Sequence, residues 1–360
     1  MMQEPGRVET PIPPAFPPTH RADWPPPPTG YSSGRHRWLI VLLLLLLAIS
    51  VMINLNLLWR PGPEMPPRVR EQFHSLNRSG RDKVAIITVS GIIFDEENGF
   101  VKRQIDQALK DDRVKAVVLR IDSPGGTVSD ADYLLQHLSQ LRKQKPLVVS
   151  MGGTAASGGY YIAMAVGDTP DTIFAEPTTW TGSIGVIIPH YNLETLFSKL
   201  GVEEDSVASH PLKNMGTPAR KMTEEERRIF EDLVNDSFNR FKEVIRSGRR
   251  RFAKAPEELD RLATGQVFTA SDAMECGLVD KIGFLEDAID RAIELAGLIE
   301  DDVCVVRYKQ EPSLSDLLWG FGQVRGHNWR ELLQAVSPRP YYLMTFMPVW
   351  ISSFGNRLVQ

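Results

Sequence analysis

The sequence is poor in the residues that form cross-links and metal sites. Its 360 residues include only two cysteines, Cys276 and Cys304, and neither stands in a metal-ligand spacing. Two distant cysteines exclude a disulfide framework, so each is predicted to be a small buried residue. We therefore expect no metal site and no cofactor.

A basic stripe is also absent. The formal net charge is −4, and the run Arg249–Arg251 lies in a charged stretch that is typical of a solvated helix end. Without a concentrated positive face, the sequence indicates no nucleic-acid partner.

Histidine motifs are lacking as well. Four of the seven histidines lie well inside the part expected to fold, and none has the glycine or small neighbours of a catalytic motif: His137, His190, His210 and His327. For His190, which follows a proline, a surface histidine is the ordinary interpretation. This weakens a Ser-His-Asp scheme and leaves lysine as the other candidate base.

Prolines and apolar residues, by contrast, concentrate near the N-terminus. Fourteen of the 26 prolines precede residue 68, so residues 1–34 are predicted to be a disordered Pro-rich tail. Leu39–Leu58 is a run of 20 residues without a charge, and as a helix it would match the hydrocarbon core of a bilayer, about 30 Å thick. We expect a transmembrane anchor at residues 35–60 and a linker at 61–80, with a cleaved signal peptide as the alternative.

The orientation of this anchor is not decided by charge, because arginines flank both of its ends. The simpler topology for a single N-terminal anchor has a cytoplasmic tail. The folded domain then lies on the outer (periplasmic or extracytoplasmic) face of the membrane.

After Lys83, short apolar runs alternate with helical stretches. Strands are predicted at residues 84–89, 115–121 and 147–150, with helices at 100–110 and 129–143 between them. This alternation predicts an α/β fold with a largely parallel sheet covered by helices.

The second half of the chain is more helical. Thr223–Glu226 is a predicted capping box, and the apolar stripe from Phe230 to Ile245 indicates a helix that faces the core or a subunit interface. Residues 299–360 are predicted to hold a strand and an apolar tail. Within the tail, Tyr341–Ile351 is expected to dock on a neighbour or at the membrane surface.

One serine stands out for its small neighbours. Ser157 lies in Met151–Tyr161 directly after a predicted strand, and a second glycine motif, Ser123–Gly126, follows the strand before it. Sites form at the carboxyl ends of parallel strands, where two backbone N–H groups can make an oxyanion hole. The alternative is a tight glycine turn with a solvated serine. Lys213 is a candidate base, although a loop lysine is by default a solvated charge.

Five motifs occur in order between Val84 and about Gly283: Arg120–Gly126, Ala155–Tyr161, Thr181–Val186, Lys213–Pro218 with Met222–Glu225, and Gly265–Thr269 with Gly277–Asp280. Together they resemble the short, single-repeat form of the signal peptide peptidase SppA family. The resemblance implies a ClpP/crotonase-like α/β fold of repeated ββα units with a helical extension. It also implies a protease domain over residues 81–298.

The resemblance implies residue roles too. Ser157 matches the family's nucleophile, Lys213 its general base, and Ser183 the serine that helps to hold the lysine. The oxyanion donors would be the backbone N–H groups of Gly126 and Gly158.

Some positions depart from the family pattern. Asn214 stands where the family often has aspartate, and His210-Pro211 interrupts a loop that usually contains glycine. Gly125 is the adjacent alternative to Gly126 as an oxyanion donor. These departures concern loop geometry and not the Ser-Lys dyad.

The sequence therefore predicts a membrane-anchored serine endopeptidase that degrades cleaved signal peptides or other apolar peptides. The resemblance implies a ring-shaped homo-oligomer, such as an octamer, in which the dyad is completed across subunits. Two alternatives stay open: a crotonase-type acyl-CoA enzyme and a non-catalytic membrane scaffold.

Overall fold

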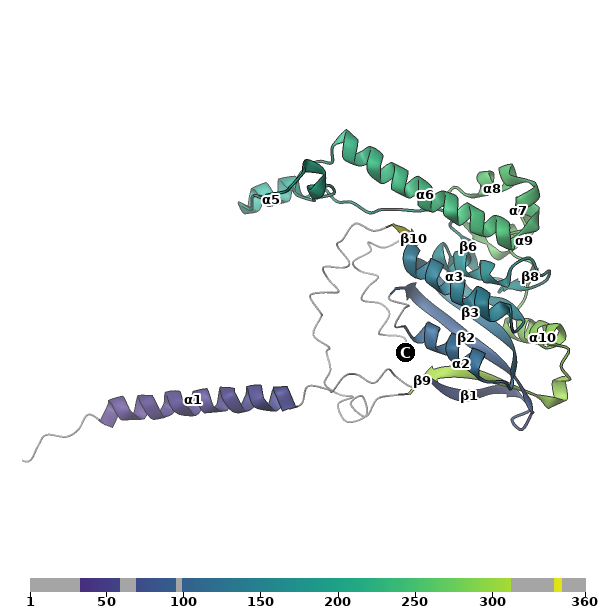
Figure 1. Ribbon diagram of the computed structural model, residues 1–360, viewed down its shortest axis with the longest axis horizontal. Helices are drawn as coiled ribbons and strands as arrows, with labels where there is room; N and C mark the ends of the chain where they lie inside the picture. Colours follow the sequence, from purple (N-terminus) through teal and green to yellow (C-terminus); the bar gives the residue numbers. More distant parts are fainter. Residues whose placement is uncertain (1–32, 59–68, 95–98, 312–339, 345–360) are drawn as a thin grey trace, which may run out of the picture. The chain divides into compact units, whose positions relative to one another are not determined.

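The computed structural model describes residues 33–58, 69–94, 99–311 and 340–344 (Figure 1). The chain divides into two units, residues 1–65 and residues 66–360. The predicted Pro-rich tail and most of the C-terminal apolar tail lie outside the described residues.

Helix α1 (Ser33–Leu58) belongs to the first unit and covers the predicted apolar run. The side chains from Trp38 to Met52 are all exposed. Within the described residues, no helix combines the length and the apolar character that a membrane crossing needs. The anchor at residues 35–60 stays a prediction.

A ten-stranded sheet forms the centre of the second unit. Its main path runs β1-β9-β2-β3-β4-β5-β8, while β10 pairs with β3 and β6 joins β4 to β7. All pairs from β9 to β8 on this path are parallel. The strands are β1 (Val69–Leu76), β2 (Asp82–Ile93), β3 (Val114–Thr127), β4 (Leu147–Ala156), β5 (Ile173–Ala175), β6 (Trp180–Gly182), β7 (Val267–Thr269), β8 (Lys281–Ile282), β9 (Val303–Gln310) and β10 (Tyr341–Leu343).

Helices cover both faces of the sheet. One face packs against the larger apolar cluster, which includes Ile105, Leu134 and Phe241 from three helices. The other face packs against the helix that carries Ala288 and Ile289. The helices of the second unit are α2 (Phe100–Lys110), α3 (Val128–Arg142), α4 (Gly158–Ala163), η1 (Met164–Val166), α5 (Glu194–Leu200), η2 (Pro211–Asn214), α6 (Glu224–Gly248), α7 (Arg250–Lys254), α8 (Pro256–Leu262), α9 (Ala270–Glu275), α10 (Leu285–Ala296) and η3 (Glu300–Asp302).

Burial on both faces explains the composition of the central strands. Val84–Ile87 of β2 and Ala116–Leu119 of β3 are fully buried, so these strands are continuous apolar runs and do not alternate. The α/β architecture predicted from the sequence is confirmed. The helix predicted at 100–110 coincides with α2, and both bonds of the predicted capping box at Thr223 are present.

Three local predictions were wrong or incomplete. Val69–Leu76, inside the predicted linker, is strand β1, because it pairs antiparallel with β9. Tyr341–Leu343 pairs with β3 of the same chain, where the Tyr342 side chain is fully buried, and residues 345–351 of the predicted docking segment lie outside the described residues. Cys304 is buried, whereas Cys276 is only partly buried.

Candidate active site

Two glycine-rich strand ends meet at the carboxyl edge of the sheet. Strand β3 carries Ser123–Gly126 near its end, and β4 ends immediately before Ser157. The two strands are parallel, and their register pairs Ser123 with Ala155. Adjacent parallel strands thus bring the two motifs together, as the strand pattern predicts.

Ser157 has a backbone conformation that is uncommon for a residue with a side chain. Its φ is 53° and its ψ −113°, a region that costs about 1–3 kcal/mol outside glycine. The backbone N–H donates to the Gly182 carbonyl at 2.8 Å, and the Tyr161 N–H donates to the Ser157 carbonyl at 2.8 Å. These two bonds hold the sharp turn between β4 and α4.

The Ser157 hydroxyl is buried and unsatisfied. The residue is 1% exposed, and its Oγ has no hydrogen-bond partner in the described part of the chain. Leaving a buried hydroxyl unpaired costs about 1–3 kcal/mol. Strain and an unpaired hydroxyl at the same residue are typical of a functional position.

Gly125, Gly126 and Gly158 make a tight backbone cradle beside this serine. A Cβ on Gly125, whose φ is +102°, would stand 2.7 Å from the Gly158 nitrogen. A Cβ on Gly158 would stand 3.1 Å from the Gly126 nitrogen. Only residues without side chains allow the two backbone segments to approach so closely.

Strand β10 lies along this cradle. Its register pairs Tyr342 with Gly126 and Leu343 with Gly125 in an antiparallel sense. The Tyr342 carbonyl oxygen lies between Gly125 and Gly158, 3.1 Å from where a Cβ on Gly158 would stand. An extended segment of this chain therefore places a peptide carbonyl beside the glycine cradle.

The Tyr342 side chain enters an aromatic pocket. Its ring centroid lies 4.8 Å from that of Tyr161 and 4.6 Å from that of Phe241, and its hydroxyl donates to the Ser237 carbonyl at 2.8 Å. Tyr161 in turn donates to Asp132 at 2.5 Å. Burial and this bond raise the pKa of Tyr161, so the hydroxyl stays protonated as a donor.

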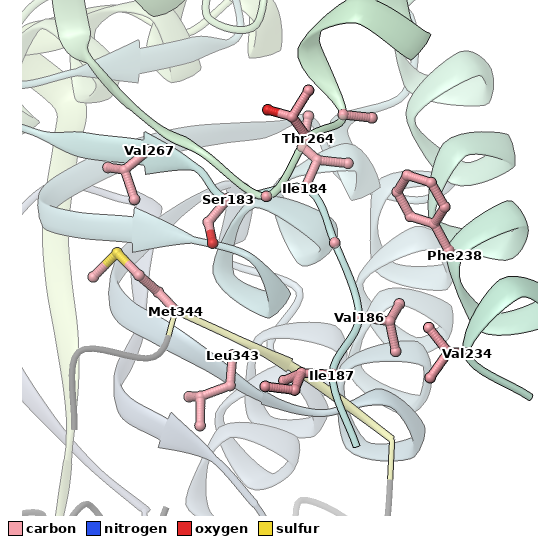
Figure 2. A pocket seen from close by; sticks show the side chains of 13 residues that line it. Ser183, Ile184, Val186, Ile187, Val234, Phe238, Thr264, Val267, Leu343 and Met344 are labelled. Atoms are coloured by element: carbon pink, nitrogen blue, oxygen red, sulfur yellow. The ribbon is translucent and has the colours of Figure 1, made fainter. Parts of the chain in front are cut away.

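Ser183 directly follows β6, the strand that pairs with the end of β4. It follows Gly182, which pairs with Ala156, and its N–H donates to the Gln266 carbonyl at 2.7 Å. It lines a cavity of about 430 Å³. Figure 2 shows Ser183 and Met344 on one side of this cavity and Phe238 and Val234 of α6 on another.

Lys213 is not part of this cluster. It lies on η2, in the segment between α5 and α6, and its side chain is exposed. Its ammonium group makes no hydrogen bond or ion pair with any described residue. Figure 1 shows α5 standing away from the sheet, beyond the first turns of α6.

The structure thus brings together four of the five residues predicted for the site: Ser157, Ser183, Gly126 and Gly158. Gly125 joins them as the neighbour of the Gly158 nitrogen, whereas Lys213 stays apart. From the sequence we expect Tyr341–Ile351 to dock on a neighbour or at the membrane surface, and we do not predict that Tyr342 pairs with Gly126 of the same chain. The short apolar repeat Tyr341–Leu343 behind Pro340 was the available signal, because it is typical of a short strand.

Comparisons with known proteins agree with this geometry. Residues 139–299 match the family described as Peptidase family S49. The chain is 35% identical over 276 residues to "Putative protease slr0021" of Synechocystis sp.. The matched region covers 74% of this chain and 97% of that protein. The chain belongs to the SppA family of S49 peptidases. Membership of this family supports a serine protease.

Other S49 relatives differ in length. "Putative signal peptide peptidase SppA" of Enterococcus faecium is 34% identical over 71% of this chain and 75% of its own length. "Protease 4" of Salmonella typhi is 35% identical over 71% of this chain, but this match spans only 41% of that relative.

Proposed function

We propose that the chain is a serine endopeptidase that uses Ser157 and Lys213 as a dyad and cleaves extended apolar peptides, such as spent signal peptides. The observation that carries this proposal is β10. It lies as an extended strand along Gly125 and Gly126, with the Tyr342 carbonyl beside Gly125 and Gly158. A substrate peptide can use the same strand edge by main-chain pairing.

The chemistry follows from this placement. The Ser157 Oγ attacks the peptide carbonyl carbon while the Lys213 amine takes its proton, and the backbone N–H groups of Gly126 and Gly158 stabilise the oxyanion. The intermediate then collapses, the C–N bond breaks, and the lysine returns the proton to the leaving amine. Water hydrolyses the acyl-enzyme by the same route.

We propose further that Lys213 reaches the serine from a second copy of the chain in a ring-shaped oligomer such as an octamer. Within one chain Lys213 is exposed and the Ser157 hydroxyl lacks a partner. The cavity beside Ser183 has room for an incoming side chain and is lined mainly by apolar groups. Burial away from water favours the neutral amine that a base needs.

Membrane attachment through residues 35–60 is a proposal from the sequence alone. An apolar run of 20 residues and the flanking Trp38 and Trp59 support it, and it would place the protease domain on the outer face with a cytoplasmic tail. Alkaline carbonate extraction of membranes tests it: extraction of the full chain into the soluble fraction would contradict the proposal.

A fluorophosphonate probe tests the dyad, because it labels only an activated serine. The assembled wild type should be labelled, Ser157→Ala should not, and Lys213→Ala should react at least about 100-fold more slowly. Lys199→Ala is the matched control, since Lys199 is another exposed lysine of the same arm. This arm is the segment from α5 to η2, residues 194–214. Because β10 covers the cradle, the series is repeated with Tyr342→Ala. Equal labelling of wild type and Lys213→Ala would reject the dyad.

The same experiment separates the alternatives. A crotonase-type acyl-CoA enzyme needs the oxyanion donors but neither Ser157 nor Lys213. Its rate of acyl-group hydrolysis or transfer would therefore be the same in Ser157→Ala and Lys213→Ala as in the wild type. A non-catalytic scaffold would not be labelled in any background.

A further inference from the structure

The loop that carries Lys213 is tied together by one carboxylate. Glu204 accepts hydrogen bonds from the side chains of Ser206 at 3.0 Å, Asn214 at 2.5 Å and Thr217 at 2.5 Å. Asn214 directly follows Lys213, and Thr217 lies four residues after it. The carboxylate therefore links the start of the loop to both positions that follow the lysine.

The lysine lies in a stretch with little regular structure of its own. Between the end of α5 at Leu200 and the start of α6 at Glu224, the described chain forms only the short η2. The Lys213 N–H donates to the His210 carbonyl at 2.9 Å, and the Thr217 N–H reaches the Asn214 carbonyl at 3.4 Å. Such local turns do not fix how the loop is placed.

The C-terminal end of the loop, at Pro218 and Arg220, is held by other hydrogen bonds. The Leu193 N–H donates to the Pro218 carbonyl at 2.7 Å, and Arg220 pairs with Glu226 at the first turn of α6. At the N-terminal end of the loop, residues 203–209, Glu204 is the acceptor of every side-chain hydrogen bond in the described structure.

Glu204 makes these contacts although it is exposed. An exposed carboxylate is ordinarily satisfied by water, and three side-chain donors on one such group are not required for folding. The three bonds, with that from Thr217 first, lower the pKa of Glu204, so the group is an ionised acceptor at neutral pH.

We propose that Glu204 is a positioning residue for Lys213: it fixes Asn214 and Thr217 and so sets the direction in which the lysine leaves the loop. This inference rests on the proposed function, in which Lys213 is the general base. A base displaced by about 1 Å can lose on the order of 100-fold in rate, so a loop anchor of this kind acts on kcat and not on substrate binding.

The first test compares Glu204→Gln with Glu203→Gln. The glutamine keeps one acceptor oxygen but turns an NH₂ group toward the Asn214 NH₂ group, so at least one bond is lost. We expect kcat and the fluorophosphonate labelling rate to fall about tenfold, with KM unchanged within about twofold. Glu203 is the matched control, because it is adjacent, exposed and without a contact in the described structure.

The second test exchanges the two groups. Asn214→Asp alone places a second carboxylate against that of Glu204, so the hydrogen bond between these two positions is replaced by charge repulsion. This variant should lower kcat to a similar extent. The double variant Glu204→Gln/Asn214→Asp restores one donor and one acceptor with reversed polarity, and kcat should recover to within about threefold of wild type. Thermal unfolding and oligomer size, measured for each variant, should match the wild type.

Each outcome decides the inference. It is overturned if Glu204→Gln behaves like Glu203→Gln, or if the double variant is no better than the two single ones. Lys213→Ala separates this failure from that of the dyad. An active Lys213→Ala rejects the dyad itself, whereas an inactive Lys213→Ala beside a fully active Glu204→Gln rejects only the role of Glu204.

Discussion

At the scale of single residues, the site depends on backbone positions that few residue types can occupy. Ser157 has φ 53° and Ser183 has φ 50°, both in the left-handed region that favours glycine. Each directly follows one of two neighbouring strands, β4 and β6. The Ser157 N–H donates to the Gly182 carbonyl and so joins the two strand ends. Two neighbouring serines with strained backbones indicate that the surrounding structure holds the place of each hydroxyl, in addition to the site requiring a serine.

Gly125 offers a test of the cradle. In Gly125→Ala the added methyl group would overlap the Tyr342 carbonyl and stand 2.7 Å from the Gly158 nitrogen. Any peptide carbonyl bound there would be displaced in the same way, so we expect labelling of Ser157 to fall at least about 100-fold, the effect of losing an oxyanion donor. Fluorophosphonate labelling, followed with time, measures it.

Gly297→Ala is the matched control for this substitution. Gly297 also has a positive φ, +65°, but nothing lies within 4 Å of an added Cβ. Both variants should lose about 1 kcal/mol of stability from backbone strain, and Gly125→Ala should lose more because its methyl group overlaps the Tyr342 carbonyl. Only Gly125→Ala should lose labelling. Similar labelling of the two variants would mean that the cradle does not bind the reacting carbonyl.

Much of this residue cluster could be predicted because parallel strands impose it. Ser123–Gly126 and Ser157 follow adjacent strands, and the register of β3 and β4 leaves their ends side by side. The placement of Lys213 could not be predicted from such a pattern. Its loop lies on an arm with no buried residue in α5 or η2, so hydrophobic burial within one chain does not determine where the lysine goes.

At the scale of elements, the strand ends were harder to predict than the helices. Apolar composition predicts β3 only to Ile121, but the strand continues to Thr127 through Pro124-Gly-Gly126. This extension is held by neighbours, since β2 pairs with Gly125 and Gly126 on one side and β10 on the other. Helix α6 was easier, because its cap is a local four-residue signal.

The cap of α6 carries a pH-dependent prediction. Glu226 is 1% exposed and pairs with Arg220 at 2.6 Å, and chiefly this hydrogen bond lowers the pKa of Glu226 from 4.5 to about 2. A lowered folded-state pKa gives stability that is complete above pH 4.5 and is lost as the pH falls toward 2. Glu226→Gln should therefore cost about 1–3 kcal/mol at pH 7 and progressively less below pH 4.5.

Urea unfolding at pH 7 and pH 3 measures this difference. Glu225→Gln serves as the control, because Glu225 is exposed in the same helical turn and makes no contact in the described structure. If the cost of Glu226→Gln were the same at both pH values, the ion pair with Arg220 would not be the source of the stability.

At the scale of the whole molecule, the separation of Lys213 from Ser157 within one chain is the basis for the proposed assembly across subunits. One chain holds a buried serine without a partner and an exposed lysine without a partner among the described residues. In a closed ring with head-to-tail contacts, each interface presents the arm of one subunit to the cleft of the next. In the proposed ring, each active site would take its serine and its lysine from different chains.

Mixed assemblies test this arrangement directly. Ser157→Ala and Lys213→Ala chains, each inactive alone, are co-expressed with different affinity tags and purified on both. With random mixing at equal amounts, one interface in four joins an intact serine to an intact lysine, so labelling should return to about a quarter of the wild-type level. Pairing Lys213→Ala with a Ser157→Ala/Lys213→Ala chain leaves no intact lysine and should stay inactive. If the dyad formed within one chain, no mixture of the two single variants would regain activity, and the arm would have to fold back onto its own cleft.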